Sequence, residues 1–197
     1  MQITAVKVLL CLVLLFPFVL IASALFLNPD ALGANPVEEA IHQTGEWAIR
    51  LLLITLAISP LRRLFRLHFL ISFRRMLGLL CFVYACAHLS LYIIFEHYFN
   101  WLDIWADIYK RPYITAGFIA FLLLIPLALT STNNMQKRLQ YRWVQLHKLI
   151  YPVAILAILH FWWKQKADYQ EPLFYAIILA ALLGYRIYIH LKQKAEL

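Results

Sequence analysis

The chain has 197 residues, of which 63% are hydrophobic and only 14% are charged, and its mean hydropathy is +0.72. This balance excludes a large soluble domain and predicts one integral membrane domain over residues 1–197, because the apolar residues lie in repeated long blocks. The net charge of +8 does not indicate nucleic-acid binding, because the basic residues cluster in loops on one side of the predicted spans.

Six apolar segments are long enough to cross a membrane, which predicts an all-α, polytopic bundle of six transmembrane spans. In chain order they are residues 6–27, 45–61, 69–95, 112–130, 144–163 and 172–190. The first segment extends to Leu27, which is longer than the apolar core of a typical signal peptide, so we expect it to be a retained span. The second is short and carries Arg50, which can pair with Glu46 one turn earlier or extend to the interface.

The distribution of basic residues predicts the orientation of the spans. With the N-terminus inside, thirteen of the eighteen Lys and Arg residues fall in inside segments. Cytoplasmic segments carry such an excess, so we expect both termini to be cytoplasmic. Two outer loops, at about 28–44 and 96–111, are long enough to dock a partner, and Asp103 and Asp107 in the second loop are the expected contacts.

Three histidines, His88, His147 and His160, lie inside apolar spans, where a histidine is costly and usually has a function. Neutral imidazole is a natural ligand for haem iron. His88 lies in the outer half of the third span and His160 lies near the outer end of the fifth. We therefore expect these two side chains to face each other and to bind one haem from both sides.

His147 lies thirteen residues before His160, which is about 20 Å along a helix, and so near the cytoplasmic end of the fifth span. Its depth partner on the third span is Arg74, which shares a helix face with His88. A guanidinium is a poor metal ligand, so Arg74 would meet a haem propionate or lie near a second iron, with His147 as the main ligand. Thirteen steps rotate by about 220°, so His147 and His160 share a face only if the helix is distorted, for example at Pro152.

Other interpretations remain open for these residues. Each intramembrane histidine can instead bond a neighbouring carbonyl or hydroxyl group and bind nothing. The five glycines are isolated, so the chain has no dinucleotide or phosphate-binding loop, and electrons must come from a quinone, a separate reductase or a bound flavin. The remaining histidines lie in loops or at span ends and are expected at the surface: His42, His68, His97 and His190.

Several stretches of the chain form a set of motifs: Leu32–Pro36, Arg74–Leu79, His88 with Tyr92, Arg111–Tyr113, Leu129–Ser131, Trp143–His147 with Tyr151, and His160. Together these motifs resemble the bacterial MsrQ (YedZ) family, the haem-binding membrane subunits of the periplasmic methionine sulfoxide reductase system. The resemblance covers nearly the whole chain and its order of spans. The wider superfamily is the ferric reductase-like transmembrane domain, whose haem-binding core would be roughly residues 45–163. Members with two stacked haems carry four histidines, and Arg74 stands where the fourth is expected.

The resemblance implies an electron-transfer subunit of an oxidoreductase, rather than its catalytic subunit, in the bacterial inner membrane. Respiratory quinol or a cytosolic flavin reductase would supply electrons to one or two haem b groups. The acceptor would be a periplasmic molybdenum-containing subunit (MsrP-like), bound as a heterodimer, that reduces methionine sulfoxide. The family is also associated with FMN, for which no motif marks a site. The alternatives are a stand-alone ferric or cupric reductase and a small transporter without haem.

Overall fold

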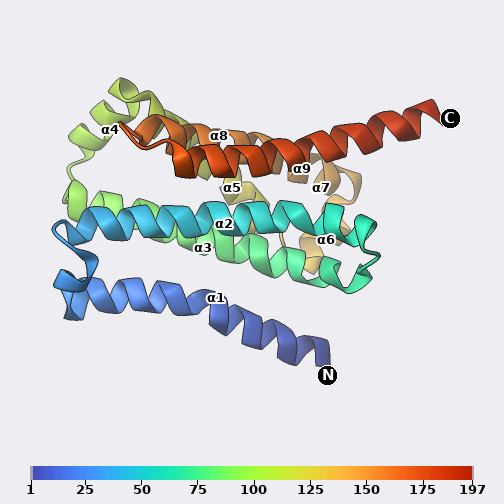
Figure 1. Ribbon diagram of the computed structural model, residues 1–197, viewed down its shortest axis with the longest axis horizontal. Helices are drawn as coiled ribbons and strands as arrows, with labels where there is room; N and C mark the ends of the chain where they lie inside the picture. Colours follow the sequence, from blue (N-terminus) through green and yellow to red (C-terminus); the bar gives the residue numbers. More distant parts are fainter. Residues whose placement is uncertain (1, 197) are drawn as a thin grey trace.

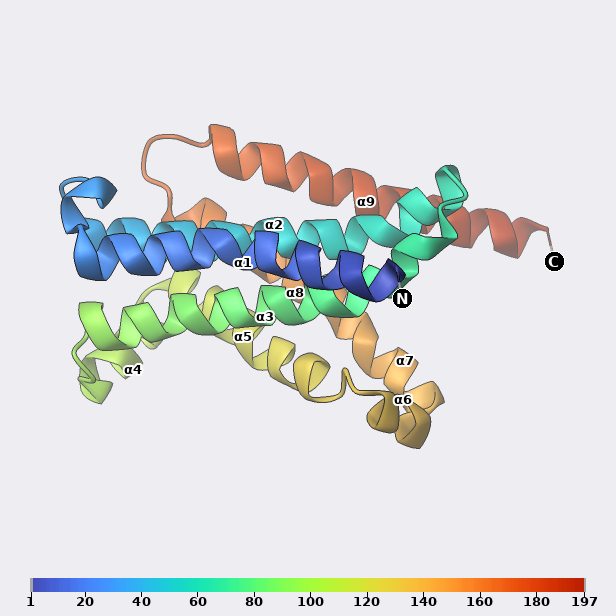
Figure 2. The same ribbon diagram turned by 90° about the horizontal axis from the view of Figure 1, so that it is seen from below.

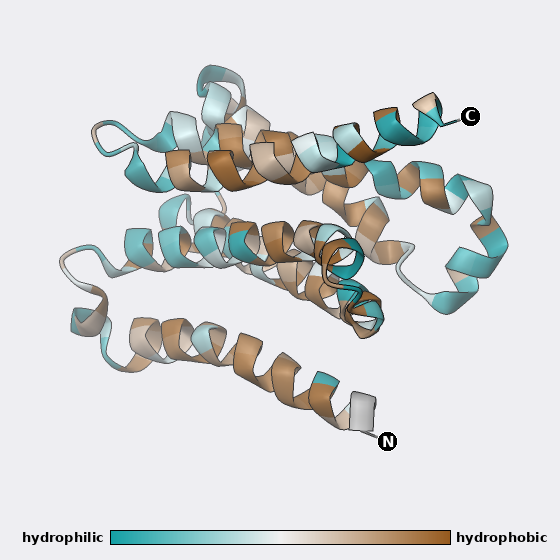
Figure 3. Ribbon diagram, turned by 45° about the vertical axis from the view of Figure 1, so that its right-hand side comes forward, coloured by the Kyte–Doolittle hydropathy of each residue, from teal (hydrophilic) through white to brown (hydrophobic). Residues whose placement is uncertain are grey.

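The computed structural model describes residues 2–196, which form helices and turns with no β-strand among them. Six helical segments are long and apolar enough to cross a membrane, which confirms the predicted all-α bundle. They run along one common direction (Figure 1) and are apolar in the middle and polar at their ends (Figure 3). The chain is therefore a multi-pass membrane protein. The segments are Thr4–Leu27, Pro36–Leu64, His68–Glu96, Pro112–Leu129, Tyr141–Lys164 and Gln170–Ala195.

These spans contain α-helices interrupted by tighter or wider turns. Three short 3-10 turns (η1, η2 and η4) and one π-helical turn (η3) accompany nine α-helices among the described residues. In chain order the elements are α1 (Gln2–Leu27), η1 (Pro29–Leu32), α2 (Pro36–Leu64), η2 (His68–Phe73), α3 (Arg74–Leu91), η3 (Tyr92–Glu96), α4 (Trp101–Lys110), α5 (Pro112–Leu129), α6 (Asn133–Leu139), α7 (Tyr141–Leu146), η4 (His147–Leu149), α8 (Ile150–Lys164) and α9 (Gln170–Ala195).

The bundle has two distinct ends. One carries residues 28–35, 97–111 and 165–169, and we call it the cavity end. The other carries both ends of the described chain, residues 65–73 and helices α6 and α7, and we call it the termini end (Figures 1 and 2). Both ends of the described chain thus lie at the same end of the bundle, and the cytoplasmic position of that end stays a prediction.

Helix α2 lies at the centre of the packing, because it contacts α1, α3, α8 and α9. Its residues Leu51 and Leu56 are almost completely buried. The most extensive helix pairs are α2 with α3 and α5 with α8. The bundle is therefore built from two helix pairs, and each of them carries one of the histidines that were predicted to face each other.

Helix α1 is the least buried span and covers α2 and α3 from one side (Figure 2). It bends near Pro17, which cannot donate a backbone hydrogen bond (Figure 1). The hydroxyl of the fully buried Tyr84 donates to the carbonyl of Leu14 at 2.7 Å, which anchors α1 to α3. The large exposed side chains of α1, such as Leu12, are those of a lipid-facing helix.

The cavity end contains helices where the sequence predicted two long outer loops. The second span begins at Pro36 rather than near residue 45, because Asn35 caps the helix and accepts a hydrogen bond from the Glu38 amide. Residues 101–110 form the strongly amphipathic helix α4, capped by Asn100. In the first predicted loop, about 28–44, residues 28–35 precede α2 and the rest belong to that helix. Both predicted loops are therefore largely helical.

A proline in α2 explains a contact with α9. Pro60 has no N–H group to bond the carbonyl of Leu56, four residues earlier. The guanidinium of Arg186 donates to that oxygen at 2.6 Å and to the hydroxyl of Tyr151 at 3.1 Å. In a bilayer an unpaired backbone carbonyl is costly, so Arg186 fastens α9 to the point where the α2 ladder is broken.

Replacing Arg186 with methionine should destabilise the bundle by about 1–3 kcal/mol, because a buried carbonyl loses a charged donor. Unfolding in mixed detergent micelles measures this change. The matched control is Lys192→Met, since Lys192 is exposed and its ammonium lies 3.8 Å from the carboxylate of Glu196. In a Pro60→Ala background the helix can bond Leu56 itself, so Arg186→Met should cost clearly less there. An equal cost in both backgrounds would contradict this explanation.

Candidate functional site

A cavity of about 1320 Å³ opens between the helices at the cavity end. Typical small-molecule sites occupy about 300–1,000 Å³, so this space accommodates a large, mostly apolar group. Its walls come from α2, α3, α5 and α8, and helix α4 contributes Trp101 and Trp105 at the mouth. His88 and His160 both line it, whereas His147 and Arg74 do not.

His88 of α3 and His160 of α8 face each other across this cavity. Their ring centroids lie 5.9 Å apart and their planes are nearly perpendicular, at 83°. The side chains come from different helix pairs, so packing of the pairs brings them together. The prediction that these two residues meet at similar depth is therefore confirmed.

Backbone carbonyl groups fix the orientation of both rings. His88 Nδ1 lies 2.8 Å from the carbonyl oxygen of Ile41, and His160 Nδ1 lies 2.7 Å from that of Tyr113. A carbonyl only accepts hydrogen bonds, so Nδ1 carries the proton in each ring and donates it. Each Nε2 therefore keeps its lone pair, which is the form in which imidazole binds a metal.

Two glycines make room for these rings. A Cβ atom at Gly45 would lie 3.0 Å from His88 Nδ1, and one at Gly117 would lie 2.7 Å from His160 Nδ1. Gly45 follows Ile41 by four residues, just as Gly117 follows Tyr113, and each histidine is 47 residues beyond its carbonyl partner. The two helix pairs thus hold their histidines in the same way. This repetition was not recognised in the sequence, where two glycines in apolar helices give no signal by themselves.

His147 lies at the termini end in a different setting. Its ring stacks on Trp143 at a centroid distance of 3.9 Å, and its Nδ1 lies 3.1 Å from the Trp143 carbonyl oxygen. The Trp143 indole N–H donates to the carbonyl of Thr130, which joins this turn to the end of α5. Nε2 of His147 is buried and has no hydrogen-bond partner among the described residues. Arg74 begins α3 at the same end of the bundle.

The helix between His147 and His160 is distorted, as Pro152 suggested. Residues 147–149 form the 3-10 turn η4, and regular α-helix resumes only at Ile150. Pro152 cannot bond the carbonyl of Lys148, four residues earlier, which accounts for the altered geometry. The two histidines therefore do not share one regular helix.

The prediction that the remaining histidines lie at the surface is correct for His68 and His190, which are exposed, and wrong for two others. His42 is half-buried in α2 and lines the cavity, because the helix begins nine residues earlier than predicted. The side chain of His97 is only 12% exposed.

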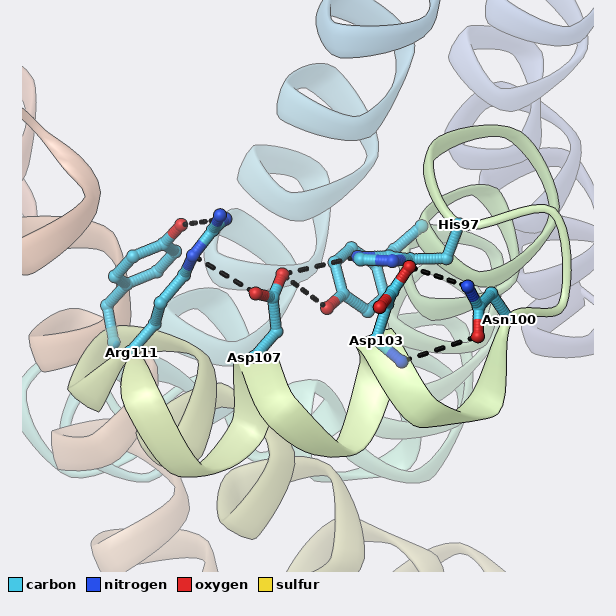
Figure 4. Close-up of polar contacts among 7 residues, drawn as sticks. His97, Asn100, Asp103, Asp107 and Arg111 are labelled. Atoms are coloured by element: carbon cyan, nitrogen blue, oxygen red, sulfur yellow. Dashed lines mark hydrogen bonds and ion pairs between the residues drawn. The ribbon is translucent and has the colours of Figure 1, made fainter.

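His97 belongs to a polar network around Asp107 (Figure 4). One oxygen of the Asp107 carboxylate lies 3.3 Å from His97 Nε2 and accepts a hydrogen bond from Tyr92, and the other lies 3.2 Å from Arg111. Asp107 therefore holds α4 against η3 and is not the free docking contact that was expected. Asp103 is exposed, and its carboxylate accepts from Asn100.

Comparison with known proteins agrees with this architecture. Residues 44–158 match the family model described as ferric reductase-like transmembrane component. The heme-binding subunit MsrQ of the protein-methionine-sulfoxide reductase from Xanthomonas campestris pv. campestris strain 8004 is 56% identical, covering 84% of this chain and 76% of that protein. The subunit of the same name from Herminiimonas arsenicoxydans is 48% identical, covering 95% of this chain and 86% of that protein.

Both the extent of these matches and their identity exceed what a shared fold alone requires. The family model covers more than half of the chain, including α3 and most of α8, the helices that carry the histidine pair. The relatives extend the likeness over most of the remaining helices. The chain belongs to the MsrQ family, within the ferric reductase-like transmembrane proteins.

Proposed function

We propose that this chain is the haem-binding, electron-transferring membrane subunit of a methionine sulfoxide reductase system. His88 and His160 would hold a haem b in the cavity, within a core formed by residues 45–163. The observation that carries the proposal is the pair of rings 5.9 Å apart, each with Nδ1 held by a carbonyl and Nε2 left as a ligand. The haem, when bound, supplies a one-electron carrier within the bilayer.

The surroundings of the pair suit such a group. The cavity walls are mainly apolar, which keeps water from the macrocycle, while Lys164 lines the cavity and can balance the carboxylates of the porphyrin. Gly45 and Gly117 keep the imidazoles seated against the neighbouring helices, so the chain orients both ligands before any group binds. Such outer contacts fix ring orientation and raise ligand basicity.

The proposal also covers the orientation of the bundle in the membrane and the donor and acceptor of its electrons. The excess of basic residues at the termini end supports a cytoplasmic position for that end, in the bacterial inner membrane. The cavity would then open toward the periplasm, where a molybdenum-containing partner would take electrons and reduce methionine sulfoxide. Respiratory quinol or a cytosolic flavin reductase would be the donor. FMN stays a proposal from family resemblance, and no residue is assigned to it.

The absorption spectrum of the purified protein tests the central proposal. We expect a Soret band and, on reduction, the α-band of a b-type haem. Reoxidation of the reduced protein by a co-purifying methionine sulfoxide reductase, but not by ferric or cupric ions, would support the proposed partner. A colourless protein from cells supplied with haem would overturn the proposal.

His147 is proposed as the ligand of a second haem at the termini end, because no hydrogen-bond partner for its buried Nε2 is found in the described part of the chain. Arg74 would offset a propionate there, since a guanidinium remains charged. We expect two haems per wild-type chain and one in His147→Ala, with an intermediate value in Arg74→Ala. Quantification of extracted haem against protein measures this ratio. One haem in both wild type and His147→Ala would contradict the assignment.

A further inference from the structure

A second group of potential ligands includes two residues of the cavity wall, His42 and Glu46, which are distinct from the histidine pair. His42 and Glu46 are four residues apart on one face of α2, and Glu171 lies in the first turn of α9. Their ligand atoms, one per residue, all lie within 4.8 Å of one another. The sequence analysis assigned none of the three a role as a metal ligand: it gave Glu46 as a possible ion-pair partner of Arg50, and it expected His42 at the surface.

These residues lie next to a further set of polar contacts between α2 and α9. One turn further along, Arg50 pairs with Glu46 at 2.7 Å and donates to the hydroxyl of Tyr175 at 2.9 Å. The charge of Arg50 is therefore balanced by a carboxylate and a hydroxyl group. The group formed by His42, Glu46 and Glu171 instead brings two carboxylates together with one imidazole.

The partners of Glu46 are incomplete in this arrangement. Glu46 is only 8% exposed, and Arg50 binds the Oε2 atom of its carboxylate. Among the described residues no donor reaches the other oxygen, Oε1, and its neighbour on α9 is the carboxyl group of Glu171, which can hydrogen-bond Glu46 only if one of the two carries a proton. A buried carboxylate oxygen without a partner is costly, and a bound cation is one way to satisfy it. Lys164 lines the same cavity as His42. Among the described residues, its ammonium group has no carboxylate within 4 Å and so does not neutralise these acidic groups.

We propose that His42, Glu46 and Glu171 form a site for a divalent transition-metal ion that ties α2 to α9 at the cavity end. One imidazole and two carboxylates are a ligand set that Zn²⁺ and other first-row divalent ions accept, with water completing the coordination. The absence of a thiolate disfavours soft ions such as Cu(I). The site shares no ligand with the histidine pair, so it stands independently of the proposed haem function.

Zn²⁺ titration of the full-length protein in detergent, after treatment with a chelator, tests the site. We expect one Zn²⁺ per chain and a rise in the thermal unfolding midpoint on binding. Outer-shell contacts alone are worth about 10–100-fold in metal affinity, so Glu171→Gln should weaken binding by at least about tenfold. Glu171 is exposed in the first turn of α9, so this variant should fold, and Glu46→Gln and His42→Ala should weaken Zn²⁺ binding as well.

The control is Glu38→Gln, which removes the same charge from an exposed position on α2, the helix of His42 and Glu46, and should leave Zn²⁺ binding unchanged. The titration is repeated in a His88→Ala/His160→Ala background, so that ions bound by the cavity histidines are not counted. A missing haem spectrum would overturn the haem proposal and leave this result intact. Failure of Zn²⁺ to bind, or equal affinity in wild type and Glu171→Gln, would overturn the metal site and indicate two carboxylates that share a proton.

Discussion

His88→Ala and His160→Ala should each remove one haem per chain from the purified protein and abolish electron delivery to the reductase. Each substitution deletes one of the two proposed ligands, whose rings are 5.9 Å apart in the cavity. Loss of a direct ligand should exceed the 10–100-fold effect of outer contacts on affinity, and alanine leaves no donor that could replace it. Extracted haem per protein and the reduced α-band measure the outcome.

His68→Ala is the matched control for this pair, because His68 is exposed at the other end of the bundle. It should keep the wild-type haem ratio and spectrum. The His147→Ala variant separates the two ends, since it should leave the signal of the cavity haem unchanged. Retention of a normal cavity signal in both His88→Ala and His160→Ala would show that the cavity histidines are not the ligands.

The span number and the facing histidines were accessible from the sequence for simple reasons. Long apolar runs have no stable alternative to membrane helices, and depth along two parallel spans follows from counting residues at about 1.5 Å each. This argument placed His88 opposite His160 without any knowledge of packing. It also placed Arg50 within reach of Glu46, and the two form an ion pair at 2.7 Å.

The features that were missed depend on contacts between distant segments. The role of Gly45 and Gly117 becomes visible only when the histidine of another helix lies against each of them. His42 was misplaced because the first turns of α2 are too polar to be recognised as part of an apolar span. Asn35 and Pro36 mark the true start of the helix. Asp107 was taken as a free charge because composition does not reveal that Tyr92, His97 and Arg111 surround it. Cap residues and helix-starting prolines would have located α2, but no local pattern predicts the Asp107 network.

Substitution of the two glycines should reproduce much of the histidine phenotype without removing a ligand. A Cβ atom at residue 117 would lie 2.7 Å from His160 Nδ1, closer than side-chain carbons and ring nitrogens normally approach. The ring must therefore move, which breaks its 2.7 Å hydrogen bond to the Tyr113 carbonyl and turns Nε2 away from the cavity centre. We expect Gly117→Ala to lower haem affinity by at least about tenfold, the magnitude seen when outer contacts of a metal ligand are lost.

The same reasoning orders the other glycines. At Gly45 the added carbon would lie 3.0 Å from His88 Nδ1, so a smaller shift relieves the contact and the loss of haem should be milder than at Gly117. Gly184→Ala is the control, since nothing lies within 4 Å of its added carbon. Alanine also favours a helix over glycine by about 1 kcal/mol, so all three variants gain helix propensity equally and differ only at the rings. Haem titration of the three proteins tests the order; equal affinities for Gly117→Ala and Gly184→Ala would mean that ring seating does not control binding.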